Sequence, residues 1–454
     1  MCQCATAVGT GSGFRFWQDD VNLGVHFDGG HLTSDGGVPW LVEAETALGV
    51  CAALAARVPE WRRGGVRHSL GRLVRQRVFQ IACGYEDQND ATTLRTDPLL
   101  KVVCGRLPET GRDLASQPTF SRLENAVRAT TCYRLALALG QVYLQERERR
   151  AREQGAPSGL PRRVLLDLDS TDAPTHGHQE GTAYHGYYDQ YMYFPLLVFD
   201  GDTDQLITAV LRPGTVHSSR GAVAVLKRIV RALRARWPGV AIELRADSGF
   251  AAPAVYDWCE AEDIGYTIGL VPNSRLEALA TPLLAEAQRQ AAPTGTKVRL
   301  AGEAQYQAGS WPHARRVVYK AEVLAEGPNT RFVVTTRKEA PLAVYDWYVD
   351  RGESENWIKD FKRACIGDRL SDHRFVANQF RLLLHAAAYW LLDTVRHWLV
   401  GAGHDRLQLD TLRLRLLKIG GRVIEWVTRV RLHLASSHPA EPLWRLLATR
   451  PARS

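Results

Sequence analysis

The sequence predicts an α/β protein in which a mixed β-sheet is flanked by helices, interrupted by a β-rich insertion, and bounded by helical regions at both ends. The first observation behind this prediction is the order β–β–β–α–β–α–β in the runs between residues 163 and 270. The second is helical spacing of apolar residues over 40–152 and again past residue 363. The third is a set of alternating β runs over 297–338. With 454 residues the chain exceeds one ordinary core, so we expect two or three domains.

The N-terminal part of the chain is predicted to be helical. The runs LVEAETALGVCAALAARV and LGRLVRQRVFQIACGY repeat apolar residues at helical spacing. The later run QERERRAREQGAPSGLPRR is first highly charged and then rich in Gly and Pro, a change that is typical of a domain boundary. We therefore predict a helical N-terminal domain over residues 1–155.

The predicted core follows this boundary. RVLLDLDS is a strand from Arg163 to Ser170, and YMYFPLLVFDGDTDQLITAVLRPG is a hairpin with an acidic-Gly turn. A helix, a strand, a second helix and a last strand come next, in SRGAVAVLKRIVRALRARW, VAIELRADSG, APAVYDWCEAED and GYTIGLV. The predicted boundaries are a core over 156–275 and 339–375, an insertion over 276–338, and a basic helical C-terminal region over 376–454.

Composition places the protein among globular chains. The sequence is 45% hydrophobic and 23% charged, and no run approaches the roughly 18 apolar residues of a membrane span. The N-terminus lacks the basic start and apolar stretch of a signal peptide, so we expect a cytoplasmic protein without membrane or small-molecule partners. Cys2 and Cys4 form C-x-C, but the absence of a CxxC pair disfavours zinc ribbons and indicates reduced, mostly buried thiols.

Positive charge is concentrated at one end of the chain. The formal net charge is +8, and the segment from Arg363 onward carries all of this excess. Arginine dominates there, and its planar fork suits phosphate groups. The pattern favours a polyanionic partner, most simply nucleic acid.

Carboxylates end two of the predicted strands. Asp167 and Asp169 are two residues apart and therefore share one face of their strand. Asp247 ends a second apolar strand, and ligands of α/β sheets collect at the carboxyl ends of strands. The alternative is structural, because aspartates in these positions also cap turns and helices.

A third carboxylate lies in YVDRGESENWIKDFK, which we predict to be one continuous helix. At about 100° per residue, one arc of roughly 60° contains four polar residues, namely Tyr348, Arg351, Glu355 and Lys362. Glu353 falls on the opposite side. The face predicted to be buried contains Trp347, Trp357, Ile358 and Phe361. A plain solvated stripe is the alternative interpretation of this polar face.

Together these carboxylates suit metal-dependent chemistry. Two strand-end aspartates and a helix-borne glutamate can hold two divalent cations, which activate water and stabilise the leaving oxygen of a phosphodiester. Ligation by oxygen alone indicates Mg²⁺, with Mn²⁺ as a possible substitute, rather than zinc.

At this point the sequence resembles insertion-sequence transposases of the DDE class. The resemblance rests on LDLDST, RADSGF and the helix pattern Y-x2-R-x3-E-x6-K, and it extends to N-terminal segments such as LASQPTFSRLEN. It implies an RNase H-like core with a β-rich insertion before the glutamate helix. It also implies Asp169, Asp247 and Glu355 as catalytic metal ligands, with Asp167 as a weaker contender. The signature residues Tyr348, Arg351 and Lys362 would contact the DNA backbone.

The function implied by this resemblance is cleavage of the element's own ends and their joining to target DNA. The implied partners are double-stranded DNA, as terminal inverted repeats and as target, and a second copy of the chain in a synaptic complex. These partners imply association with the nucleoid. The N-terminal helical domain would help recognise the inverted repeats. The alternatives are an RNase H-like nuclease without strand transfer and a non-catalytic DNA-binding regulator.

Several further residues are candidates for DNA contacts. In the insertion, Trp311 could stack on an extruded base, or it could be a core or surface tryptophan. Three basic residues near it could line a DNA path or form a solvated strand edge: Arg315, Arg316 and Lys320. His176 and His178 could bind metal or make hydrogen bonds near a turn.

Overall fold

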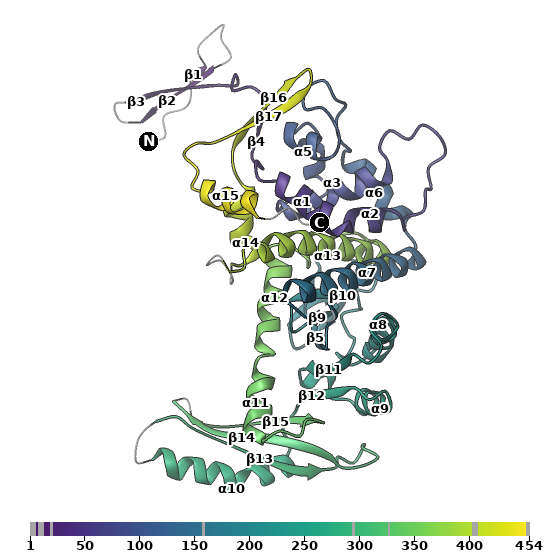
Figure 1. Ribbon diagram of the computed structural model, residues 1–454, viewed down its shortest axis with the longest axis vertical. Helices are drawn as coiled ribbons and strands as arrows, with labels where there is room; N and C mark the ends of the chain where they lie inside the picture. The colour runs from purple at the N-terminus through teal and green to yellow at the C-terminus, as the bar shows by residue number, and fades with distance from the viewer. Residues whose placement is uncertain are drawn as a thin grey trace.

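A computed structural model describes residues 6–7, 13–18, 21–156, 159–292, 296–325, 327–401 and 407–450. It confirms the predicted α/β class, with a large mixed sheet that has helices on both sides (Figure 1). Among the described residues, no helix combines the length and apolar character needed to cross a membrane.

The central sheet has eight strands in the order β10-β9-β5-β11-β12-β15-β14-β13. Strands β5, β11 and β12 run parallel, whereas β9 is antiparallel to both β5 and β10. The bounds are β5 Arg163–Ser170, β9 Leu196–Asp200, β10 Gln205–Val210, β11 Ala241–Ala246, β12 Gly265–Leu270, β13 Val298–Tyr306, β14 Arg315–Leu324 and β15 Gly327–Thr335. The central sheet and its helices follow the predicted order, and β5 begins and ends at the predicted residues. The first five positions give the strand order of an RNase H-like core. The short strands Ala173–Pro174 and Ala183–His185, which form a small separate sheet with Gln190–Tyr193, were not predicted.

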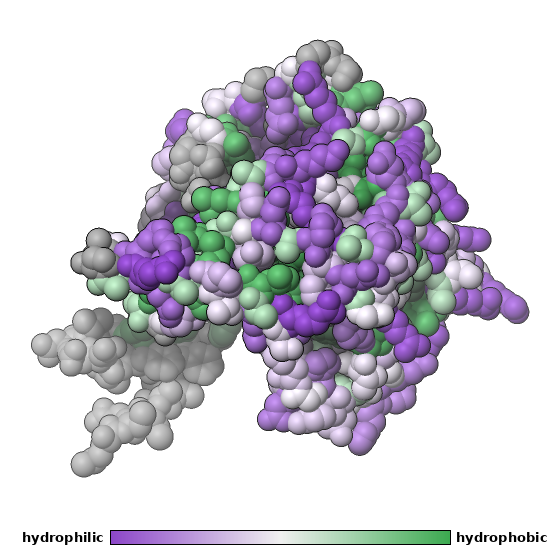
Figure 2. Space-filling view, turned by 90° about the horizontal axis from the view of Figure 1, so that it is seen from below, coloured by the Kyte–Doolittle hydropathy of each residue, from purple (hydrophilic) through white to green (hydrophobic). Residues whose placement is uncertain are grey.

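The inserted strands continue this sheet. Strand β15 pairs with β12, with Thr335 opposite Thr267, and β14 and β13 follow in antiparallel order. Helix α10 (Ser274–Ala291) contacts all three of these strands. The insertion is therefore β-rich as predicted, but its hydrogen bonds make it an extension of the core sheet. Seen from this end, the surface is mostly hydrophilic with separate hydrophobic areas (Figure 2).

Helices cover both faces of the sheet. Helices α8 (Ala222–Arg236) and α9 (Pro253–Ala261) lie on one side, and α11 (Pro341–Val349) and α12 (Gly352–Arg363) lie on the other (Figure 1). Above them, α7 (Ala129–Glu153) and α13 (Phe375–His397) both pack on β10.

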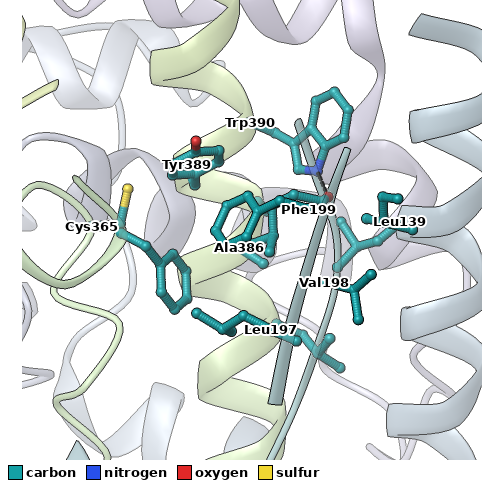
Figure 3. Packing of buried hydrophobic residues seen from close by; sticks show 14 of the residues in the cluster. Leu139, Leu197, Val198, Phe199, Cys365, Ala386, Tyr389 and Trp390 are labelled. Atoms are coloured by element: carbon teal, nitrogen blue, oxygen red, sulfur yellow. Dashed lines mark hydrogen bonds between the residues drawn. The ribbon is translucent and has the colours of Figure 1, made fainter. Parts of the chain in front are cut away.

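Helix α13 is the centre of the largest core. Its Tyr389 and Trp390 lie among Phe199 of β9, Leu139 of α7 and Cys365 (Figure 3). The Trp390 indole Nε1 donates a hydrogen bond to the Leu206 carbonyl at 3.0 Å. Since α13 is apolar around most of its circumference, it behaves as a buried helix rather than as part of an exposed basic surface.

Buried ion pairs connect three helices. Arg150 of α7 contacts Asp393 of α13 at 2.7 Å, Asp393 also contacts Arg396, and Arg396 contacts Asp360 of α12, both at 2.7 Å. All four side chains are at most 12% exposed. The charged run at the end of α7, which the sequence suggests as a boundary, is therefore partly a buried network that ties α12 to the core.

The N-terminal region is helical after an initial set of strands. Its helices are α1 Pro39–Leu48, α2 Val50–Ala55, α3 Leu70–Ala82, α4 Asp90–Leu94, α5 Pro98–Val103 and α6 Gln117–Ala126. Before them come β1 Thr6–Ala7, β2 Gly13–Gln18, β3 Val21–His26 and β4 Leu32–Thr33. The described strands before residue 34 therefore depart from the prediction of a helical domain over 1–155, whereas the helices begin at Pro39, close to the predicted start of helical spacing at residue 40.

The C-terminal region also departs from the helical prediction. After α14 (Leu409–Leu412) and a π-helical turn (Arg413–Leu417), β16 (Gly421–Trp426) and β17 (Arg429–Leu434) form a hairpin that pairs with β4. Only then does α15 (Glu441–Thr449) follow. The hairpin forms here because the side chains of RVRLHL alternate, with every second residue exposed. A period of two residues is typical of a strand.

The thiol prediction is confirmed for the described cysteines. These six are free and buried: Cys51, Cys83, Cys104, Cys132, Cys259 and Cys365. Cys2 and Cys4 lie outside the described residues.

Candidate active site

Two parallel strands bring Asp169 and Asp247 to the same edge of the sheet. Residue Ala246 of β11 is paired with Leu168 of β5, so the next residue on each strand is an aspartate. Asp169 is buried, with its Oδ1 accepting the Ser170 backbone N–H at 2.8 Å. Asp247 is partly buried and its Oδ1 accepts the Gly249 N–H at 2.9 Å, which caps the 3₁₀ turn Ser248–Phe250. Asp247 is thus both a cap and a carboxylate of this edge.

The segment that the sequence predicts as one helix is broken in two. Helix α11 ends at Val349 and α12 begins at Gly352. At the break, the backbone N–H of Arg351 donates to the Tyr348 carbonyl, three residues back, instead of making an α-helical bond. Tyr348 therefore lies on α11 and Glu355 on the first turn of α12, and the prediction of one continuous helix is wrong.

Arg351 lies between the carboxylates of the sheet and of the helix. Its Nη1 is 3.1 Å from Asp169 Oδ2, and its Nη2 is 3.6 Å from Glu355 Oε1. The buried Ser354 hydroxyl donates to the same Asp169 oxygen at 3.4 Å. The break in the helix thus places Arg351 and Ser354 over the end of β5.

Burial and neighbouring charges shift the pKa values of Asp169, Asp247 and Arg351. Burial raises the pKa of Asp169 to about 6, with Arg351 opposing the shift and Asp247 adding to it. Burial also raises the pKa of Asp247, again against the charge of Arg351. For Arg351, burial lowers the pKa, but Asp169, Tyr348 and Asp247 outweigh it and raise the pKa overall. At this edge burial therefore opposes ionisation of the two aspartates, and the charge of Arg351 favours it.

Tyr348 is held against the second strand. Its hydroxyl donates to the Ala246 carbonyl at 3.3 Å, directly before Asp247. This approach depends on Gly269 of β12, where a Cβ atom would lie 2.6 Å from the Tyr348 hydroxyl oxygen and 2.9 Å from the Ser248 nitrogen. The glycine thus leaves room for the tyrosine beside the site.

The two glutamates of α12 differ in their partners. Glu355 is 71% exposed and is paired with Arg351, whereas Glu353 accepts a hydrogen bond from Asn356 at 3.1 Å. Trp357 and Phe361 are buried, as predicted. Glu355 is therefore the glutamate that is linked through Arg351 to Asp169.

Asp167 has a different environment from Asp169. Both of its oxygens accept hydrogen bonds from Arg245 at 2.7 Å, and both side chains are at most 3% exposed. Arg245 also donates to the Trp347 carbonyl at 2.9 Å, which joins β11 to α11. Asp167, predicted as a weaker metal ligand, thus has both oxygens occupied by an arginine that positions the helix.

Lys362 reaches a carboxylate that the sequence analysis did not single out. Its Nζ is 2.8 Å from Oδ1 of Asp172, three residues after Asp169. Arg245 and Ser354 were missed as well. A signal existed for both, since Arg245 shares a strand face with Asp247, and Ser354 follows Arg351 at helical spacing.

Trp311 and Arg315 of the insertion, which were predicted to contact DNA, are buried in the structure. Trp311 is 6% exposed and packs against Tyr256 and Tyr306, so it has no face free for a base. The Arg315 side chain is 2% exposed and is paired with Asp257 and Glu260. Trp311 is therefore a core tryptophan, which was the alternative interpretation.

Arg316 and Lys320, which were also predicted to contact DNA, are paired as well. Arg316 contacts Glu303, and Lys320 contacts Glu322 and lies over the Tyr345 ring. Their charges are largely neutralised within the protein, which does not support the predicted DNA path. His176 and His178 are exposed in the loop after residue 174. In the described part of the chain they do not belong to a group of three side chains that could bind a metal ion.

The donor set at the strand ends fits a divalent cation. Asp169 and Asp247 offer hard oxygen ligands, and burial is the main cause of their raised pKa values. Glu355 would add the third carboxylate. Within the described ranges, however, no three His, Cys, Asp or Glu side chains are grouped closely enough to hold one metal ion. In this state Arg351 is the cation that Asp169 and Glu355 share.

Comparisons with known proteins identify the family of the chain. The sequence profile of the family described as "Transposase DDE domain group 1" matches residues 17–453. A search of curated protein sequences finds no match. Among solved structures, the chain is similar to a piggyBac transposase in a synaptic complex with hairpin DNA, at 12% identity and a TM-score of 0.43. That similarity covers 85% of this chain and 79% of the other.

Proposed function

Because the chain belongs to the transposase DDE domain group 1 family, we propose that it cleaves the ends of its own insertion sequence and joins them to target DNA. The observation that carries this proposal is the meeting of Asp169 and Asp247 at one sheet edge beneath Arg351. A carboxylate pair of this kind suits phosphodiester chemistry.

The roles of the residues follow from their positions. Asp169, Asp247 and Glu355 would hold Mg²⁺, as two ions, with Mn²⁺ as a substitute. When bound, these ions supply Lewis acidity at the scissile phosphodiester. Arg351, already beside both carboxylates, exchanges its ion pairs for a phosphate oxygen of the DNA, which its planar fork suits. Tyr348 and Lys362 contact the DNA backbone on either side of that phosphate.

The reaction has two steps. Hydrolysis at the end of the element breaks one P–O bond and frees a 3′-hydroxyl. This hydroxyl then attacks a phosphodiester of target DNA, forms a new P–O bond and releases a target 3′-hydroxyl. Two ends must be processed together, so we propose a homodimer in a synaptic complex at the nucleoid.

A joining assay tests this function. The purified chain is incubated with labelled DNA that carries the inverted repeats flanking its coding region, together with a target plasmid and Mg²⁺. We expect cleaved ends and plasmid-joined products. Cleavage without joined products would indicate a nuclease, and binding without cleavage would indicate a DNA-binding regulator.

A groove in the N-terminal helical region supports recognition of the element's ends there. The cavity has a volume of about 1030 Å³, and the arginines lining it are Arg62, Arg63, Arg67, Arg95, Arg112 and Arg122. We call it the arginine groove. In the described part of the chain, its ion pairs to carboxylates involve Arg62 with Glu60 and Arg95 with Asp113. Burial, together with nearby arginines, lowers the pKa of His68 in this groove to about 4. The groove is therefore positively charged and suits DNA phosphates.

Removing single charges from the arginine groove should weaken DNA binding. We expect Arg63→Ala or Arg67→Ala to lower affinity for all duplexes and to reduce the slope of log K against log salt by about 1 each. Fluorescence anisotropy titrations at several salt concentrations measure this. Arg445→Ala on α15, where the side chain is 76% exposed, is the matched control. An unchanged slope in both groove variants would exclude the groove as a DNA contact.

A further inference from the structure

A small hairpin beside the site carries exposed aromatic side chains. It consists of β7 (Ala183–His185) and β8 (Gln190–Tyr193), and β8 also pairs with β6 (Ala173–Pro174). Its three surface tyrosines are Tyr184, Tyr187 and Tyr191, with 49%, 86% and 59% exposure. We call them the tyrosine patch. Large aromatic side chains gathered in the open indicate a binding surface rather than core packing.

Hydrogen bonds tie this hairpin to the end of β5. The Gln190 amide of β8 donates to Asp172 Oδ2 at 3.2 Å. The other oxygen of Asp172 contacts Lys362 of α12 at 2.8 Å. The hairpin is therefore fixed between the strand that carries Asp169 and the helix that carries Glu355.

A series of packed rings leads from the site to the patch. Arg212 donates to the Ser170 hydroxyl at 2.7 Å, and its guanidinium lies over the Phe194 ring at 5.4 Å. Phe194 is 6.0 Å from Tyr188, which in turn is 5.1 Å from Tyr187. Burial, together with Asp172, Asp169 and Asp247, raises the pKa of Tyr188 to about 12, in keeping with its place beside these carboxylates.

The patch has a defined geometry. Tyr184 and Tyr191 face each other across the hairpin, with ring centroids 5.7 Å apart in an edge-to-face arrangement. The Tyr184 hydroxyl donates to Asp189, whose left-handed backbone (φ of 51°) forms the turn. Tyr187 meets Tyr188 edge-on at 82°, so its contact leaves ring surface exposed. The Tyr184 ring is thus held in place before any ligand arrives, with Tyr191 packed against it.

We propose that the tyrosine patch stacks unpaired nucleobases of the DNA end that lies in the active site. This inference rests on the proposed function. Stacking on an aromatic face accepts every base, and each stacked base contributes appreciably to binding. The buried Trp311 cannot supply such a face, whereas the tyrosine patch lies next to the strand end that carries the first aspartate.

Binding to two DNA ends tests the proposal. One is a blunt duplex, and the other is the same duplex with two unpaired 2-aminopurine nucleotides at its end. The full chain is titrated without divalent cations, so that no strand is cut. We expect the wild type to bind the unpaired end about tenfold more tightly and to quench 2-aminopurine fluorescence. Tyr187→Ser/Tyr191→Ser should lose both effects, and Tyr187→Phe/Tyr191→Phe should keep them.

Controls separate stacking from folding and from DNA binding itself. Tyr133→Ser, at a 45% exposed tyrosine on α7, should behave like the wild type. Melting temperatures should not change, since the substituted rings are exposed. If the serine pair retains the preference, or if the wild type binds both DNAs equally, the stacking inference is overturned while the proposed function stands. If the wild type binds neither DNA, the proposed function fails and the inference fails with it.

Discussion

Asp169→Asn is expected to lower the rate of strand cleavage by about a thousandfold or more while leaving the fold intact. Asp169 lies at the end of β5 with Arg351 at 3.1 Å, and its carboxylate is far less exposed than that of Glu355. An amide keeps its shape but loses the charge needed to hold a divalent cation. Cation stabilisation of the transition state contributes several kcal/mol, and each 1.4 kcal/mol is a factor of ten. Single-turnover cleavage of an inverted-repeat duplex in Mg²⁺ measures the effect.

The two glutamates of α12 provide a matched comparison. Glu355→Gln should lose cleavage to a similar degree, because Glu355 shares Arg351 with Asp169. Glu353→Gln should cut at nearly the wild-type rate, since its partner is Asn356 on the outer side of the helix. If the effects of the two substitutions were reversed, the assignment of Glu355 would be wrong.

Asp167→Ala is expected to cost about 3–5 kcal/mol in the free energy of unfolding. The substitution removes one partner of a buried pair and leaves the Arg245 guanidinium charged and without its carboxylate at 3% exposure. It also weakens the link from β11 to α11, which runs through the Trp347 carbonyl. Urea unfolding followed by circular dichroism measures the loss.

A double substitution shows whether the pair or the charge matters. Asp167→Leu combined with Arg245→Met replaces both partners by apolar groups and should recover most of the lost stability. A stability change within about 0.5 kcal/mol for Asp167→Ala would show that the pair is not structural. Asp169→Asn should leave the urea midpoint of unfolding nearly unchanged. We therefore expect Asp167 to affect stability and Asp169 to affect the rate of cleavage.

Local sequence patterns were sufficient to predict much of the fold. Strand β5 begins and ends as predicted because a continuous apolar run followed by acidic residues is typical of a buried parallel strand. The break between α11 and α12 was not predictable from spacing, because an ideal angle per residue assumes an unbroken helix. Hairpin β16–β17 was missed because arginine and aromatic content was given more weight than alternation.

Interior contacts decided the outcome for several candidate residues. Arg315 and Trp311 are of types that commonly contact DNA, but neighbouring acidic and aromatic side chains bury them. Asp167 and Asp169 are indistinguishable by strand face, since both point toward α11 and α12. Only the pairing of Arg245 with one of them and of Arg351 with the other separates them.

The sequence by itself determined the α/β class, the order of the core elements and the carboxylates that end two adjacent strands. These features depend on local periodicity and on residue type, which a linear pattern contains. The tertiary structure alone decided which arginine faces which carboxylate, how the inserted strands extend the sheet, and which aromatic rings remain exposed beside the site. Those outcomes depend on contacts between residues far apart in the chain, where burial and pairing rather than spacing set the energy.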